Sequence, residues 1–269
     1  MNGDAPPHDA EARDPTDPPT ETPRGPLGRL WLALPDWSYR ALGAAFCFGL
    51  VLFRARDYIV QDFWDLGPFY RFGDGRQFHV PAVRVLIDAT FLLMAISFCF
   101  RVPPKSRAVR GREILPALIG AFWPMIPLAI EPALGWVSSS WQDAYHKVLW
   151  EETLSFNRMI LGTALVLAGH AFDVWGYATL FRSFSIVPEA RVLKVTGPYR
   201  LVRHPVYLGH MMAQAGVWLF YAQTRAAWIA FYLVFVALQL YRSKMEDRVL
   251  ERAFGETYAV WKRKTFWFV

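Results

Sequence analysis

Six long apolar runs, spread over most of the 269 residues, are the feature that most limits what this chain can fold into. Their approximate bounds are 37–53, 83–100, 114–132, 159–180, 205–222 and 226–241. A helix needs about 20 apolar residues to cross a bilayer, and slightly shorter runs also qualify. A soluble helical bundle of this length could hardly bury six such runs. The sequence therefore predicts an all-α, polytopic membrane protein with about six transmembrane helices.

The composition agrees with a membrane protein. Hydrophobic residues make up 54% of the chain and charged residues 19%, whereas about 25% of a soluble domain is charged. The 12 tryptophans and the aromatic content of 16% suit side chains that lie at lipid–water boundaries. Prolines at 116, 124 and 127 fall in the third run, which we expect to be kinked and packed inside protein.

The first 28 residues are predicted to form a separate, disordered tail. Seven prolines lie between Pro6 and Pro26, with Asp, Glu and Thr between them and almost nothing to bury. The start is acidic and no apolar core follows, so the tail is not a signal peptide. We expect residues 29–158 to hold three spans, and residues 159–269 to hold three more and a cytoplasmic C-terminal tail.

The charged residues between the runs predict the topology. The connections 101–113 and 182–204 each have five basic residues against one acidic residue, and the segment 242–269 has seven basic residues. The segment 131–158 has two basic residues against four acidic ones, and 54–84 is mixed. Because positive charge marks the cytoplasmic side, we expect a multi-pass protein with both termini in the cytoplasm. The basic pI of about 9.4 then requires no nucleic-acid partner.

A first polar cluster lies at the start of the fifth run, in "GPYRLVRHPVYLG". Gly197 and Pro198 mark a turn, and Pro205 suits the first turn of a helix. Arg203 and His204 therefore lie beside a helix N-terminus, where the dipole and the free N–H groups favour anions. The alternative is that the arginines only anchor the chain among lipid headgroups.

A second cluster follows the sixth run. Arg242, Glu246 and Leu250 share one face of a helix because they are four residues apart. The alternative is a solvated ion pair with no further role. The fifth and sixth runs are joined by only "AQTR" and form a hairpin, so both clusters emerge on the same side of the membrane. We expect them to face each other around one cytoplasmic cavity.

Both clusters carry the motifs of a known group. The stretches "LFRSFSIVPEARVLKVTGPYRLVRHPVYLG" and "EDRVLERAFGETY" resemble the isoprenylcysteine carboxyl methyltransferase superfamily, which also contains phospholipid N-methyltransferases. The matching residues are Gly197, Tyr199, Arg203, His204, Pro205, Tyr207, Gly209, Glu246, Asp247, Leu250, Phe254, Gly255 and Tyr258. The resemblance covers about residues 160–264. Asp247 departs from the family pattern, which has a second glutamate there, so its reach is shorter.

The resemblance implies methyl transfer from S-adenosylmethionine bound at the cytoplasmic surface. The residues that it assigns to the cofactor are Ser185, Arg191, Val192, Leu193, Lys194, Tyr199, His204, Pro205, Val206, Tyr207 and Glu246. It places Arg242 against the methyl acceptor, and Arg203 is the second candidate for holding it. Carboxylates and aromatic faces suit the cofactor's amino group and sulfonium. No metal is required, because methyl displacement needs alignment of the reacting groups rather than an activated water.

The acceptor is expected to be lipophilic and to come from the bilayer. Carboxyl O-methylation of a prenylcysteine-like or other lipidic acid is favoured, because a carboxylate is already ionised and an arginine can hold it bidentately. Phospholipid amine N-methylation and small-thiol S-methylation are the alternatives among enzymes. A non-catalytic membrane transporter or sensor is the alternative from another class, against which the intact Glu246, His204 and Tyr207 argue.

Two ionisable residues of the fourth run need a separate interpretation. His170 and Asp173 lie one turn apart, inside the predicted membrane region. Such groups are functional candidates by default, and a mutual hydrogen bond inside the bundle is the alternative. His210 lies on a different helix face from His204, so a two-histidine metal site is not expected.

Overall fold

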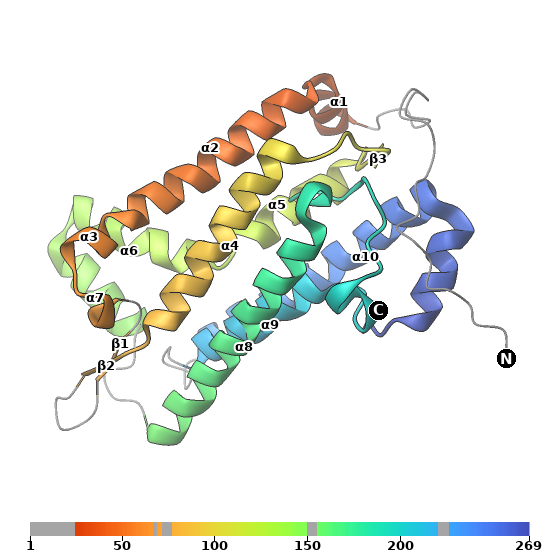
Figure 1. Ribbon diagram of the computed structural model, residues 1–269. Helices are drawn as coiled ribbons and strands as arrows, with labels where there is room; N and C mark the ends of the chain where they lie inside the picture. Colours follow the sequence, from red (N-terminus) through yellow and green to blue (C-terminus); the bar gives the residue numbers. More distant parts are fainter. Residues whose placement is uncertain (1–24, 67–68, 72–76, 150–154, 220–225, 269) are drawn as a thin grey trace, which may run out of the picture.

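The protein is an elongated bundle of helices (Figure 1). The computed structural model describes residues 25–66, 69–71, 77–149, 155–219 and 226–268. The helices are α1 (Pro26–Ala33), α2 (Asp36–Ala55), α3 (Asp57–Val60), α4 (Pro81–Phe100), α5 (Gly111–Phe122), α6 (Met125–Val137), α7 (Ser139–Leu149), α8 (Phe156–Leu180), α9 (Pro205–Trp218) and α10 (Ala226–Lys264). Two short antiparallel strand pairs join β1 (Phe69–Arg71) to β2 (Gln77–His79) and β3 (Ser106–Arg107) to β4 (Glu189–Ala190).

The helices confirm an all-α membrane protein but not all six spans. By length and composition, α4, α8 and α10 can cross a membrane, and α5 with α6 can form a fourth span that is bent by 57°. The bend lies at Pro124, which agrees with the kink predicted for the third run. Helix α2 matches the first run but carries charges at both ends, and α9 has only 14 residues. The spans predicted at these two helices therefore stay predictions.

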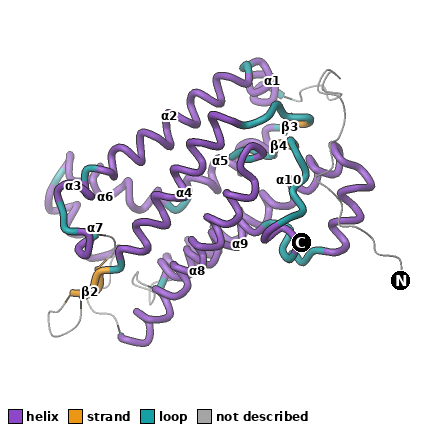
Figure 2. Tube along the Cα trace, in the orientation of Figure 1, coloured by secondary structure: helices purple, strands orange, loops and turns teal. Residues whose placement is uncertain are grey.

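The basic connections gather at one end of the bundle (Figures 1 and 2). Strands β3 and β4 pair Ser106 with Ala190, so the connections 101–113 and 182–204 lie side by side. The C-terminal half of α10 contacts both strands. Helices α3 and α7 and the β1–β2 pair lie at the opposite end. This arrangement agrees with the alternation of charge along the chain, and the side of the membrane on which each end lies stays a prediction.

Large apolar side chains are exposed along the outside of the helices, as lipid contact requires. Leu52 is 72% exposed, Phe53 79% and Trp136 92%. Both cysteines are free, and Cys47 is buried as expected, whereas Cys99 is exposed on α4. In water such a surface would mark an interaction site. On a membrane helix it is the surface that meets the acyl chains.

Helices α8 and α9 pack closely because glycines line their contact. A Cβ atom on Gly169 would lie 2.7 Å from the carbonyl oxygen of Gly209, and one on Gly216 would lie 2.5 Å from that of Gly162. No side chain fits at these distances, so small residues set the separation of the two backbones. This pair of helices is the frame on which the polar groups described below are mounted.

Two boundaries differ from those expected. Residues 1–24 of the predicted tail lie outside the described residues, and its last residues, from Pro26, already belong to α1. Helix α10 continues far beyond the predicted end of the sixth run at residue 241. It reaches Lys264, with a break at Gly255, where φ is 52°. The positive φ at Gly255 suits glycine, which explains why the motif has a glycine at this position.

Candidate functional site

The two predicted clusters meet where α9 begins beside α10. The Tyr207 hydroxyl donates a hydrogen bond of 2.7 Å to Glu246 Oε2. His204 Nε2 lies 2.6 Å from Asp247 Oδ1, and Arg203 Nη1 lies 2.9 Å from Asp247 Oδ2. The expectation that the clusters face each other at the same end of the hairpin is confirmed. The tight link itself falls at residues 220–225, outside the described residues.

Asp247 is the centre of the buried part of this site. Besides Arg203 and His204, the Tyr258 hydroxyl donates to its carboxylate, and Lys262 Nζ lies 3.4 Å away. The residue is only 4% exposed. A buried carboxylate with this many donors is satisfied inside the protein. The shorter reach of aspartate is thus sufficient here, and Asp247 fastens the start of α9 to the C-terminal part of α10.

Glu246 has the opposite environment, although it is the neighbouring residue. Its side chain is 28% exposed. Among the described residues it accepts one hydrogen bond, from Tyr207, and His204 Nδ1 lies 3.8 Å from Oε2. Successive residues of a helix point about 100° apart, which explains why one carboxylate is enclosed and the other is open. Glu246 can therefore accept a cationic group from a ligand.

Arg242 lies one turn before Glu246. Its guanidinium carbon lies 5.0 Å from the centre of the Tyr207 ring, so Tyr207 contacts both Arg242 and Glu246. The Arg242 guanidinium donates a hydrogen bond of 3.0 Å to Gln239 Oε1 and one of 3.2 Å to the carbonyl oxygen of Ile186. Its Nε is buried and has no hydrogen-bond partner among the described residues. The planar group is thus held in place by two hydrogen bonds and by the Tyr207 ring.

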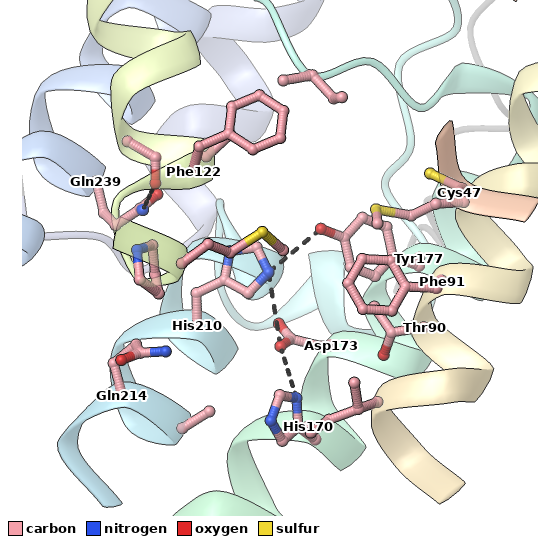
Figure 3. A pocket seen from close by; sticks show the side chains of 18 of the residues that line it. Cys47, Thr90, Phe91, Phe122, His170, Asp173, Tyr177, His210, Gln214 and Gln239 are labelled. Carbon is pink, nitrogen blue, oxygen red and sulfur yellow. Dashed lines mark hydrogen bonds and ion pairs between the residues drawn. The ribbon is translucent and has the colours of Figure 1, made fainter. Parts of the chain in front are cut away.

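Arg242 also lines a cavity of about 190 Å³ inside the bundle (Figure 3). The walls come from α2, α4, the α5–α6 junction, α8, α9 and α10, and most of the lining side chains are apolar or aromatic. The predicted cavity was a pocket at the cytoplasmic surface, surrounded by the cofactor residues. The observed cavity lies deeper, among the predicted spans, and Arg242 is the one predicted site residue that lines it. Helices from the first half of the chain supply the walls that sequence reasoning missed.

The predicted segment 191–194 contributes little to this site through its side chains. The Arg191 guanidinium is fully buried and lies 2.5 Å from Glu189 Oε2. Leu193 packs against Tyr199 and Val249 in an apolar cluster, and Val192 and Lys194 beside it are half-buried. A contact between Arg191 and a cofactor would have to come from its backbone.

The group around Arg191 is an ion cluster that ties the two halves of the chain together. Asp36 Oδ1, at the start of α2, lies 3.0 Å from Arg101, 2.6 Å from Arg107 and 3.5 Å from Arg191. Burial works to raise the pKa of Asp36. A hydrogen bond from the arginine one turn further along α2 and the charges of the three clustered arginines outweigh burial, so this pKa lies below its ordinary value.

The remaining predicted residues surround the meeting point of the two clusters. Tyr199 is buried, and burial first, then the charge of Glu246, raises the pKa of its phenol well above the usual value. Ser185 lies between Phe184 and Ile186, which both line the cavity. Pro205 and Val206 open α9 and are buried. These residues pack the site from the side of the connection 182–204.

The C-terminal segment also completes the site, and the motifs gave no signal of this. Trp267 Nε1 donates a hydrogen bond of 2.8 Å to Ser243 Oγ, and the centres of the Trp267 and His204 rings lie 5.1 Å apart. The backbone of Phe266 pairs with Leu201 and Arg203. The run of aromatic residues in "KTFWFV" was visible in the sequence, but nothing there indicated its partner.

Comparison with known proteins gives one match. The phospholipid methyltransferase family matches residues 157–257, which comprise α8, α9 and most of α10. The match covers less than half of the chain. The family is part of the superfamily of membrane methyltransferases that the two motifs resemble. The matched region contains all the predicted site residues from Ser185 to Glu246, whereas α2 and α4 lie outside it. No curated protein and no solved structure matches the chain.

Proposed function

We propose that the protein transfers a methyl group from S-adenosylmethionine to the carboxylate of a lipophilic acid. The family supports the reaction class, a membrane methyltransferase that acts on lipid. One observation carries the choice of acceptor. Arg242, only 5% exposed, lines an apolar cavity and at the same time packs on Tyr207, beside Glu246.

The residues present suit the cofactor. Glu246 is a half-open carboxylate with one hydrogen bond, so it can hold an ammonium group. The rings of His204, Tyr207 and Trp267 lie close together and offer faces to a positive sulfur. Bound S-adenosylmethionine supplies a methyl group on a positively charged sulfur. The chain's own contribution is to hold and orient the reacting groups. Asp247 fixes the position of His204 and the start of α9 relative to α10.

The acceptor would lie on the other side of Tyr207, with its apolar part in the cavity. A carboxylate is ionised at neutral pH and needs no base. A guanidinium can hold it in a defined plane, and Arg242, which lines the cavity, supplies this group. Charge disappears when a carboxylate meets a sulfonium, so a cavity poor in water favours the reaction. Arg203 pairs with Asp247 and does not line the cavity, so we assign it a positioning role.

The second candidate is N-methylation of a phospholipid amine, which the name of the matched family favours. The two reactions give products of different stability. A methyl ester releases methanol in mild alkali, whereas an N-methyl product does not. The first experiment is to incubate the membrane protein with a lipid extract and methyl-labelled cofactor, and to treat the labelled product with alkali. A base-stable product would overturn the carboxylate acceptor and leave the methyltransferase assignment intact.

Arg242→Lys tests the residue that carries the proposal. An ammonium keeps the charge but not the planar fork, so the variant should bind the cofactor normally and lose most turnover. Arg248→Lys is the matched control, because Arg248 is exposed on the same helix and should be replaceable. Full turnover of Arg242→Lys would remove Arg242 from the acceptor site.

A further inference from the structure

A chain of polar side chains on the cavity wall has no part in the proposed reaction (Figure 3). The Tyr177 hydroxyl lies 3.3 Å from His210 Nε2, and the same nitrogen lies 3.7 Å from Asp173 Oδ2. His170 Nδ1 lies 3.6 Å from that oxygen on the other side. Tyr177, Asp173 and His170 come from successive turns of α8, and His210 comes from α9. All but the tyrosine–histidine contact exceed hydrogen-bond distance.

The centre of this chain is a carboxyl group without a partner. Asp173 is 0% exposed, and neither of its oxygens has a hydrogen bond among the described residues. His170 Nδ1 is likewise buried without one. Buried polar atoms are nearly always satisfied, and leaving them unsatisfied is costly. The mutual hydrogen bond between His170 and Asp173, which was the alternative to a functional role, is not formed, and both residues line the cavity.

Helix packing fixes Asp173 in this position. Gly209, in the motif at the start of α9, lies against the carboxyl group, and a Cβ atom there would be 3.0 Å from Asp173 Cγ. The side chain cannot turn toward α9 to find a donor in the backbone, because α9 already fills that space. Asp173 also lines the cavity. The donor that Asp173 needs must come from whatever occupies the cavity.

The occupant meets a cationic group as well, because Arg242 lines the same cavity. The rest of the wall is largely apolar, with Phe46, Phe91 and Phe122 among its residues. An occupant that satisfies all three surfaces has an apolar body, an anionic group for Arg242 and a hydrogen-bond donor for Asp173. A plain fatty acid provides the first two and leaves the carboxyl group of Asp173 unpartnered.

We propose that Asp173, with His170 and His210, recognises an O–H or N–H group of the acceptor. The acceptor is accordingly a lipophilic acid that carries a hydroxyl or amide N–H near its carboxylate. This inference rests on the proposed function, because it assumes that the acid acceptor occupies the cavity. It adds a selectivity for acids with a donor over acids without one. In the described part of the chain, no group of three His, Cys, Asp or Glu side chains is arranged to hold a metal ion.

Paired ligands of equal chain length test the inference by binding alone. One pair is an N-acylglycine and the corresponding N-acylsarcosine, which differ by a methyl group in place of the amide hydrogen. The second pair is a 2-hydroxy and a 2-methoxy fatty acid. Calorimetry on the full-length protein in detergent should show that the donor-bearing member of at least one pair binds about 5- to 150-fold more tightly. Equal affinities within both pairs would overturn the inference, and this comparison needs no variant.

Asp173→Asn then locates the selectivity. The amide keeps the shape of the side chain but replaces one acceptor by a donor. The ratio of the two affinities within the preferred pair of ligands should therefore fall toward one. Thr90→Val is the matched control. Thr90 lines the same cavity, but its hydroxyl already donates 2.9 Å to the carbonyl of Leu86, so the ratio should be kept. A ratio unchanged in Asp173→Asn would also overturn the inference.

Product analysis on the same samples separates this inference from the proposed function. If base-labile ester forms equally well from both members of each pair, the proposed function stands and the donor recognition fails. If the acids bind with the expected preference but no ester forms, the recognition site stands and carboxyl methylation fails. Tighter binding of a long-chain amine than of either acid, lost in Asp173→Asn, would overturn the acid class itself.

Discussion

Removing the charge of Asp247 should unfold the site, because this carboxylate is the common partner of both clusters. Asp247→Asn keeps the shape of the side chain, but it removes the carboxylate charge that pairs with Arg203 inside the protein. The side chains of this pair are 8% and 6% exposed, so the values for buried pairs apply. Breaking such a pair from one side costs about 3–5 kcal/mol. Because 1.4 kcal/mol is a factor of ten, the ratio of folded to unfolded protein should fall by about 10²- to 10⁴-fold.

The assay is unfolding followed by tryptophan fluorescence in detergent, which Trp261 and Trp267 beside the site should report. Glu256→Gln is the matched control. It makes the same chemical change in the exposed pair of Glu256 with Arg263 on the same helix, 3.1 Å apart, and should alter stability little. Asp247→Glu restores the residue of the family pattern and should lie between the two.

One result would refute this reasoning directly. If Asp247→Asn unfolds at the same midpoint as the unchanged protein, the carboxylate is not the charged centre that joins α9 to α10. If the exposed control loses as much stability as Asp247→Asn, the loss follows from removing any carboxylate charge and not from the buried pair. A loss confined to Asp247→Asn would place the effect at the buried pair.

Three other predictions follow from the site and the fold. Glu246→Gln should weaken cofactor binding about 10- to 150-fold, since a charged hydrogen bond contributes about 1.5–3 kcal/mol, and unchanged binding by calorimetry would remove Glu246 from the site. Gly169→Ala should destabilise the protein by about 1–3 kcal/mol, because its Cβ would lie 2.7 Å from a carbonyl oxygen of α9, whereas Gly49→Ala, with nothing within 4 Å, should not. In a cysteine-free background, single cysteines at the exposed Arg112 and Ser139 should be labelled from opposite sides of the membrane, and labelling from the same side would contradict the predicted topology.

Local features of the fold could be predicted because each depends on a short stretch of sequence. The apolar runs predicted the helices, and the three prolines of the third run predicted that it would be bent. The meeting of Tyr207 with Glu246 was predictable because a hairpin brings its two ends together. The family motifs indicated which residues of the two ends would take part, and the structure shows the contact between them.

Other features depend on contacts between distant segments, which no local pattern reveals. Asp36 and Arg191 are 155 residues apart in the sequence and share one ion cluster. The family resemblance assigned Arg191 to the cofactor, whereas the structure uses its charge to join two halves of the chain. The enclosure of Asp247 was also invisible in the sequence, since its donors come from the residues just before α9 and from two later turns of α10.

The half of the chain without a recognised motif has a defined relation to the site. Gln239 donates 3.0 Å to the carbonyl oxygen of Gly120 in α5 and accepts from Arg242. A Cβ atom on Gly120 would lie 2.8 Å from Arg242 Cδ, so α5 approaches the arginine closely only because this residue is glycine. Helices α2 and α4 add walls of the cavity that Arg242 lines. The region that matches the family thus supplies the charged groups, whereas the first half of the chain sets the orientation of Arg242 and the shape of the space in front of it. Because an acceptor is selected by the space that it must fill, we expect substitutions in α2, α4 and α5 to change which acid is methylated more than whether the cofactor binds.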